Sequence, residues 1–149
     1  MTAAAEWAWK DGWVLASIVL ANASEHPDLA GVIGVADSIN KAVPRRDELE
    51  RAVNRLTGGG LLHPTEALVP TERAASLWER ARGDGVGWTW ASVERLVGLL
   101  NEECHPLDPD TWWSLSDAEH VEAYGVYRDR FGKRPIPSRL EMERRHRSD

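Results

Sequence analysis

Residues 44–71 read PRRDELERAVNRLTGGGLLHPTEALVPT, and this stretch decides the fold that we predict for the chain. Its apolar residues recur at positions i, i+3, i+4 and i+7, on one face of a helix: Leu49, Ala52, Val53 and Leu56. Pro44 suits the first turn of this helix, because the N–H that proline lacks would have no partner there. The run Gly58–Gly60 ends the helix, since glycine adopts left-handed backbone angles without steric cost. The sequence therefore predicts a helix over residues 44–57.

Two short apolar runs follow the glycines and predict a small β-hairpin. Residues 61–63 and residues 67–70 would form two brief strands, with Pro64-Thr65-Glu66 between them as the turn. Thr71 suits the N-cap of a following helix, because its hydroxyl can accept a hydrogen bond from an unpaired backbone N–H. The stretch thus predicts a helix, a hairpin and a further helix in that order.

Apolar periodicity and capping residues predict helices on both sides of this stretch. The expected helices cover residues 12–23 after Asp11, residues 29–40 after Asp28, residues 72–82 after Thr71, residues 90–103 after Thr89 and residues 117–131 between Ser116 and Gly132. Ser116 and Glu119 fit a capping box, in which each side chain accepts a bond from the other residue's backbone N–H. Gly31 and Gly34 weaken their helix by up to about 1 kcal/mol each relative to alanine, so its packing must compensate.

Length and glycine content indicate the domain organisation. A chain of 149 residues fits one domain, or one small domain with an appendage. The glycine-rich run over residues 83–87 is the predicted boundary. We expect a folded domain over residues 1–83, a helical extension for dimerisation or interaction over residues 84–132, and a basic tail over residues 133–149. The composition of the tail fits a short helix as well as a disordered terminus.

The charge of the chain is acidic and unevenly spread. It carries 18 Lys and Arg residues against 24 Asp and Glu residues, a formal net charge of −6. Acidic residues gather in residues 84–127, where Arg95 is the one basic residue, whereas residues 128–149 form a basic end. A net-acidic chain is a poor general ligand for polyanions, so nucleic acid would have to be contacted by local basic patches.

Several protein classes are disfavoured by composition. No apolar run approaches the roughly 20 residues that a membrane span requires, so we expect no membrane association. Cys104 is the single cysteine, which excludes an internal disulfide. The N-terminus shows no basic stretch followed by a long apolar one, as a secretory signal would. We therefore expect a cytoplasmic protein.

The motifs DELERAVNRLTGGGLL (residues 47–62) and LVPTERAASL (residues 68–77) resemble the winged helix-turn-helix superfamily of bacterial regulators, including its MarR-like and PadR-like families. The former motif is similar to a recognition helix running into a wing strand, and the latter is similar to the other wing strand entering a helix. The resemblance covers residues 11–82. It implies a mainly α fold, with three helices plus a short two-stranded wing and a C-terminal helical extension. It also implies a homodimeric, DNA-binding transcription regulator, although the wing tip His63-Pro64-Thr65-Glu66 lacks the usual Lys or Arg.

Five polar residues around the helix over residues 44–57 are the candidate contacts to double-stranded DNA. They are Arg45, Arg46, Arg51, Asn54 and Arg55. Two of the arginines lie in the first turn, where a recognition helix meets base edges, and arginine binds guanine or phosphate in a bidentate way. Asp47, Glu48 and Glu50 share this surface and repel phosphate, so contact with protein or with solvent alone stays open. A winged-helix protein–protein interaction module without DNA binding is the alternative function.

Eight tryptophans against one phenylalanine are an unusual set. They fit either a core between the first domain and the C-terminal helices, or a subunit or ligand interface. Signals for catalysis and metal binding are weak, since Cys104 and His105 have no second pair at zinc-ligand spacing. The sequence also lacks a phosphate-binding glycine loop and a serine nucleophile elbow. We therefore expect no catalytic residue, no cofactor, no metal and no enzyme.

Overall fold

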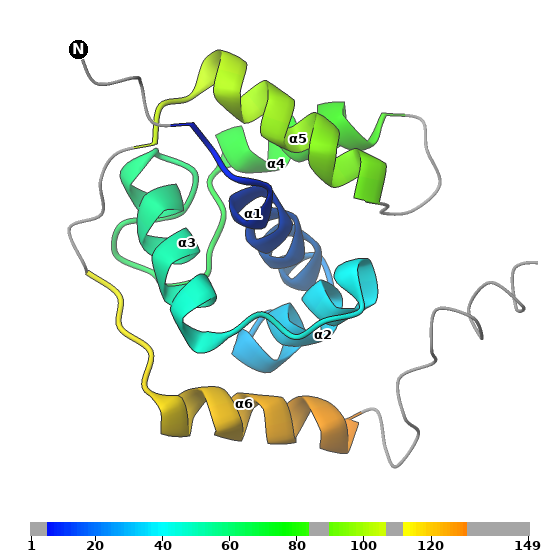
Figure 1. The fold of residues 1–149 in the computed structure, drawn as a ribbon, viewed down its shortest axis with the longest axis vertical. Helices are drawn as coiled ribbons and strands as arrows, with labels where there is room; N and C mark the ends of the chain where they lie inside the picture. Colours follow the sequence, from blue (N-terminus) through cyan, green and yellow to red (C-terminus); the bar gives the residue numbers. More distant parts are fainter. Residues whose placement is uncertain (1–5, 84–89, 107–111, 131–149) are drawn as a thin grey trace, which may run out of the picture.

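The computed structural model describes residues 6–83, 90–106 and 112–130, whose regular structure is helical throughout (Figure 1). The helices are α1 (Trp9–Asn22), α2 (Leu29–Asn40), α3 (Arg46–Gly58), α4 (Glu72–Arg82), α5 (Trp90–Glu103) and α6 (Asp117–Arg130). The mainly α class is thus confirmed. No helix in the described segments is long and apolar enough to cross a membrane.

Helix α1 lies at the centre of the fold and packs against α2, α3, α4 and α5 (Figure 1). Nearly its whole circumference is apolar, so most of its residues are buried, including the consecutive run Trp13–Ile18. A helix that is apolar all round belongs in the interior of a protein. The apolar composition of α1 therefore explains its central position, and the other helices pack around it.

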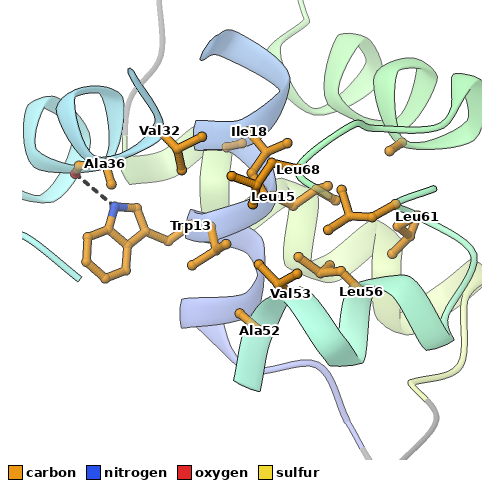
Figure 2. Close-up of a cluster of buried hydrophobic side chains, with 14 of the residues drawn as sticks. Trp13, Leu15, Ile18, Val32, Ala36, Ala52, Val53, Leu56, Leu61 and Leu68 are labelled. Carbon is orange, nitrogen blue, oxygen red and sulfur yellow. Dashed lines mark hydrogen bonds between the residues drawn. The ribbon is translucent and has the colours of Figure 1, made fainter. Parts of the chain in front are cut away.

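The core between α1, α2 and α3 is closed by leucines from the connection that follows α3. Ile18 of α1 lies beside Val32 of α2, Leu15 of α1 lies between Ile18 and Val53 of α3, and Leu61 and Leu68 of the connection complete the cluster (Figure 2). All of these side chains are less than a tenth exposed. Burying a leucine or isoleucine side chain contributes about 1.5–3 kcal/mol, so this cluster fixes the position of α3.

The predicted two-stranded wing is wrong. Between residues 61 and 71 the chain forms only an isolated antiparallel bridge, between Leu62 and Pro70. Leu61 and Leu62 are both buried, whereas neighbouring residues of a strand point to opposite faces. Leu68 adopts a left-handed conformation with φ of 61°, which turns the chain before a ladder can extend. Apolar burial thus overrides strand pairing in this connection.

Three of the predicted helix caps are confirmed. Asp28 accepts a hydrogen bond from the N–H of Gly31 (3.0 Å), and Thr71 accepts one from Ala74 (3.4 Å). The capping box that opens α6 is also present, with Ser116 and Glu119 each accepting the other's backbone N–H at 3.1 and 3.2 Å. The predicted cap Thr89 and the predicted terminator Gly132 lie outside the described residues.

The N-terminus of α1 differs from the prediction, because the helix begins at Trp9 and its N-cap is Ala8. Asp11 lies inside the first turn, and its carboxylate accepts the N–H of Ala8 at 2.9 Å. Helix α3 likewise begins at Arg46, with Arg45 as N-cap and the carboxylate of Glu48 accepting the Arg45 N–H at 3.0 Å. In both helices an acidic side chain reaches back to the cap.

The two C-terminal helices lie on different sides of the central group (Figure 1). Helix α5 packs on α1 and α4 and contributes to the same core as α1–α3. Helix α6 packs on α2. Most of the predicted domain boundary and all of the predicted basic tail, residues 133–149, fall outside the part of the chain that the structure describes.

Candidate functional site

Both flanks of α3, on either side of its exposed ridge, are covered by other segments of the same chain. At 100° per residue, the buried stripe of α3 is bordered on one side by Arg46, Glu50 and Asn54, and on the other by Glu48 and Arg55. Residues 112–116, which we name the strap, cover the first flank, and residues 6–11 cover the second. These contacts determine which side chains of α3 remain accessible to a ligand outside the chain.

Asn54 is the central contact between α3 and the strap. Its Oδ1 accepts the backbone N–H groups of Trp112 (3.1 Å) and Trp113 (3.0 Å). Its Nδ2 donates to the carbonyl oxygens of Trp113 and Glu50, each at 2.8 Å. A side-chain amide offers two donors and one acceptor oxygen with two lone pairs, so all of its hydrogen-bonding capacity is used. With only 3% of its surface exposed, Asn54 is a buried polar group that is fully satisfied.

Arg46 and Glu50 hold the other end of the strap at Leu115. The Glu50 carboxylate accepts the N–H of Leu115 at 2.9 Å, and the Arg46 guanidinium donates to its carbonyl oxygen at 2.9 Å. Arg46 also pairs with Glu50 at 2.9 Å and with Asp117, the first residue of α6, at 3.3 Å. Both main-chain groups of Leu115 are therefore bound by side chains of α3.

Arg55 covers the opposite flank and is buried, with 6% of its surface exposed. Its guanidinium pairs with Asp11 at 3.3 Å, donates to the carbonyl oxygen of Glu6 at 2.9 Å and lies 5.6 Å from the centroid of the Trp7 ring. Trp7 in turn donates through Nε1 to the carbonyl oxygen of Cys104, just after α5, at 3.1 Å. Arg55 therefore joins α3 to the N-terminal segment, which is itself held to the end of α5.

A narrow ridge is left exposed on α3, with Asp47 and Arg51 on it and the N-cap Arg45 at its start. The Arg45 side chain is 70% exposed and lies within 3.5 Å of the carboxylates of Asp47 and Glu48. Arg51 is exposed and forms no ion pair with any residue that the structure describes. The ridge therefore mixes positive and negative charge.

The five predicted DNA contacts are thus separated by the fold. Arg45 and Arg51 are exposed, Arg46 is bound in the strap network, and Asn54 and Arg55 are buried. A helical wheel gives the direction of each side chain but not the distant segments that cover it. The sequence analysis missed Glu50 and the strap. The available signal was the polar row at 46, 50 and 54 beside the apolar stripe, which makes these side chains neighbours on the helix but does not tell a covered row from a solvent-exposed one.

Helix α6 continues from the strap, packs on α2 and makes polar contacts at both of its ends, one with the link between α2 and α3 and one with the N-cap of α2. Near its start, the ring of His120 lies 2.9 Å from the carbonyl oxygen of Pro44. At its end, Arg130 makes a bidentate ion pair with Asp28 at 2.6 and 2.8 Å. The hydrogen bonds from Arg130 lower the pKa of Asp28 from 3.8 to about 2.

The Tyr127 hydroxyl, at the α6–α2 contact, donates to the Asp37 carboxylate at 3.1 Å. Burial raises the pKa of Asp37, because a low-dielectric environment disfavours the charged form. Burial, together with the adjacent Asp37, raises the pKa of the Tyr127 phenol. The tyrosine therefore stays protonated and able to donate. We assign this pair to the attachment of α6 and not to chemistry.

Other features of the described segments are weaker candidates. Trp9 stacks between Trp13 and Trp90, with ring centroids 5.8 and 3.9 Å apart, and Trp90 is 49% exposed. Burial raises the pKa of the Cys104 thiol, which disfavours the reactive thiolate. Among the residues described, no group of three or more His, Cys, Asp or Glu side chains could hold a metal ion.

Comparison of the chain with family models, curated proteins and solved structures finds no match. The geometry of α3 and the strap is therefore the basis for a functional proposal.

Proposed function

We propose that this chain is a helical protein-interaction module in which α3 binds polypeptide. The observation that carries the proposal is the set of hydrogen bonds from Arg46, Glu50 and Asn54 to main-chain atoms of the strap. These side chains satisfy both the N–H and the carbonyl oxygen of two residues, Trp113 and Leu115. Side chains placed in this way are suited to a polypeptide backbone, which presents paired donors and acceptors along its length.

The same geometry makes α3 a poor surface for duplex DNA. A recognition helix needs free donors and acceptors at base edges, and those of Asn54 are all occupied. Phosphate binding needs accessible cations, and Arg55 is buried against Asp11. The carboxylates of Asp47 and Glu48 lie beside the exposed Arg45 and oppose a polyanion. These facts favour the interaction module.

Duplex DNA remains the competing ligand because the guanidinium groups of Arg45 and Arg51 are exposed on α3. A titration of the full chain with mixed-sequence duplex DNA at rising salt separates the two functions. We expect no binding at low salt. Binding that weakens steeply with salt, and whose salt slope falls in the double variant Arg45→Ala/Arg51→Ala, would overturn the proposal in favour of a DNA-binding regulator.

The matched control for that titration is the double variant Arg80→Ala/Arg82→Ala. It also removes two positive charges, but from α4 and not from α3. A change in DNA binding shared by both double variants reports net charge alone. A change confined to the α3 variant reports contact through the ridge.

A further inference from the structure

We infer that Arg46, Glu50 and Asn54, named here the ladder, form a binding site for an extended peptide, and that the strap occupies this site from within the chain. The ligand class is a segment with an aromatic residue, any residue and then a leucine. This inference rests on the proposed function, since it names the kind of polypeptide that α3 binds. A segment of this class would bind in place of the strap.

The spacing of the ladder matches the repeat of an extended chain. Its residues stand four apart on α3, and an α-helix rises about 6 Å over four residues. An extended chain advances about 6.6 Å over two residues, so a helix row at this spacing keeps register with alternate residues of a strand. The step from Asn54 to Glu50 follows this rule in antiparallel order, and Arg46 adds a second hydrogen bond at the residue that Glu50 binds. Asn54 binds residue 113, and Glu50 with Arg46 binds residue 115.

The hydrogen bonds from the ladder to the strap end on main-chain atoms, so they do not depend on the side chains that the ligand carries. Selectivity comes instead from the side chains that alternate with them. Leu115 is 2% exposed and Trp113 is half-buried, whereas Trp112 and Ser114 face solvent. A ligand therefore needs apolar side chains at the positions of Trp113 and Leu115 only. An acidic residue two positions after the leucine would add the ion pair that Asp117 makes with Arg46.

The strap and α6 are together named the arm (residues 112–130). The arm can detach from α2 and α3 while the rest of the chain stays folded. Three of the arm's side chains are buried: Leu115, Ala123 and Tyr127. The ion pair that ends the arm, between Arg130 and Asp28, is exposed. The core around α1 is otherwise supplied by residues before the arm. Segments with few buried apolar contacts open at a lower free-energy cost than the global unfolding of a domain.

A labelled synthetic peptide of residues 112–130, added to the full chain and followed by fluorescence anisotropy, tests the site. In the wild type the tethered arm competes at a high effective concentration, so the added peptide binds weakly. Leu115→Asp in the full chain places a charge at a buried position and frees the ladder. The apparent dissociation constant should then fall by about tenfold or more, because it scales inversely with the fraction of open sites.

Adding Asn54→Leu to that variant should weaken peptide binding by about tenfold or more, since three hydrogen bonds to the ligand are lost. Arg80→Ala in the same background is the matched control and should bind as before. A peptide with aspartate in place of its leucine should not bind. Failure of the Leu115→Asp chain to bind the wild-type peptide, or binding that is indifferent to Asn54→Leu, would overturn the inference.

Hydrogen exchange on the wild-type chain gives a further test that needs no folded variant. The amides of Trp113 and Leu115 should be protected, yet exchange faster than the amide of Leu15 in α1. Exchange of all three only through global unfolding would overturn the inference, because the strap would then never leave the ladder. A negative peptide test with a negative DNA titration rejects the ladder site but leaves the proposed function, with polypeptide bound at the exposed ridge of α3 instead. A positive DNA titration rejects the proposed function itself.

Discussion

The side-chain amide of Asn54 forms a closed pair of hydrogen bonds with the main chain of Trp113, although 59 positions separate the two residues in sequence. Nδ2 donates to the carbonyl oxygen at 2.8 Å, and Oδ1 accepts the N–H at 3.0 Å. The main chain of Trp113 thus receives the same two hydrogen bonds that a paired residue in an antiparallel sheet would receive, but from a helix side chain. This pair of hydrogen bonds ties the C-terminal arm to α3 without a second strand.

Replacing Asn54 with alanine should destabilise the fold by about 1–3 kcal/mol, because three partly buried main-chain groups of the strap lose their partner. Urea unfolding of the full chain measures this loss. Thr57→Ala is the matched control on the same helix, since the Thr57 hydroxyl only donates to the Val53 carbonyl oxygen within α3. We expect that variant to stay within about 0.5 kcal/mol of the wild type. Equal effects of the two changes would contradict the role given to Asn54.

The buried pair of Arg55 and Asp11 should respond very differently to single and double substitution. Removing one partner leaves an uncompensated buried charge, so Asp11→Ala or Arg55→Ala should cost about 3–5 kcal/mol. Replacing both with apolar residues, as in Asp11→Leu/Arg55→Met, should recover most of that loss. Arg45→Ala is the comparison, because Arg45 pairs with carboxylates on the same helix while 70% exposed. An exposed pair contributes about 0–1 kcal/mol.

Thermal or urea unfolding of Asp11→Ala, Arg55→Ala and the double variant Asp11→Ala/Arg55→Ala, beside the wild type, forms a double-substitution cycle. The expected outcome is a large coupling between Asp11 and Arg55 and almost no effect at Arg45. Additive losses at the two buried positions would show that each side chain acts through its own packing and not through the ion pair.

The predictions that the structure confirms are those that depend on residues close together in sequence. Helix α2 begins and ends where the sequence placed it, since Asp28 is a strong N-cap and apolar residues fill most of the following twelve positions. The start of α1 was missed by several residues, because its N-cap is Ala8, which has no capping group. Aspartate is a common N-cap residue, so Asp11 was predicted to be the cap. Its actual partner, Arg55, lies 44 positions away.

The failures at the wing and at α3 share one physical cause. Strand propensity near Leu61 and Leu68 was overridden by long-range burial against α1, which no local pattern records (Figure 2). The polar flanks of α3 were expected to face solvent for the same reason. No residue near Asn54 or Arg55 in the sequence indicates that the strap and residues 6–11 cover these two side chains. A continuous polar row beside an apolar stripe is ambiguous until its distant partner is known.

Glycine substitutions should separate a glycine required by packing from one that merely lowers helix propensity. A Cβ at Gly31 would lie 1.7 Å from the carbonyl oxygen of His26, which no L side chain can tolerate. Gly31→Ala should therefore destabilise the fold despite its gain in propensity. A Cβ at Gly98, in the middle of α5, meets nothing within 4 Å. Gly98→Ala should stabilise by about 0.5–1 kcal/mol.

Denaturant midpoints of the two alanine variants measure this contrast directly. The two changes make the same chemical substitution inside helices, so propensity alone predicts the same sign for both. Stabilisation by Gly31→Ala would mean that the chain between α1 and α2 can move away from the helix, against the observed packing of His26.

The ion pair between Asp28 and Arg130 should make the attachment of α6 sensitive to acid. Because Arg130 lowers the pKa of Asp28 from 3.8 to about 2 in the folded chain, the pair stabilises the fold fully above pH 3.8. That contribution is lost as the pH falls through about 2. Asp28→Asn keeps an N-cap for α2 but removes the charge, and Arg130→Gln removes the partner but keeps the cap.

Both variants should therefore lose less stability than the wild type between pH 4 and pH 2, measured by urea unfolding at each pH. Since the two changes remove one interaction, the double variant should follow the single variants and show no further change in slope. The Cε protons of Tyr127, followed by NMR, give a local readout, because this ring lies one turn before Arg130 and beside Asp37. An unchanged acid slope in both variants would show that the pair between Asp28 and Arg130 does not stabilise the fold in solution.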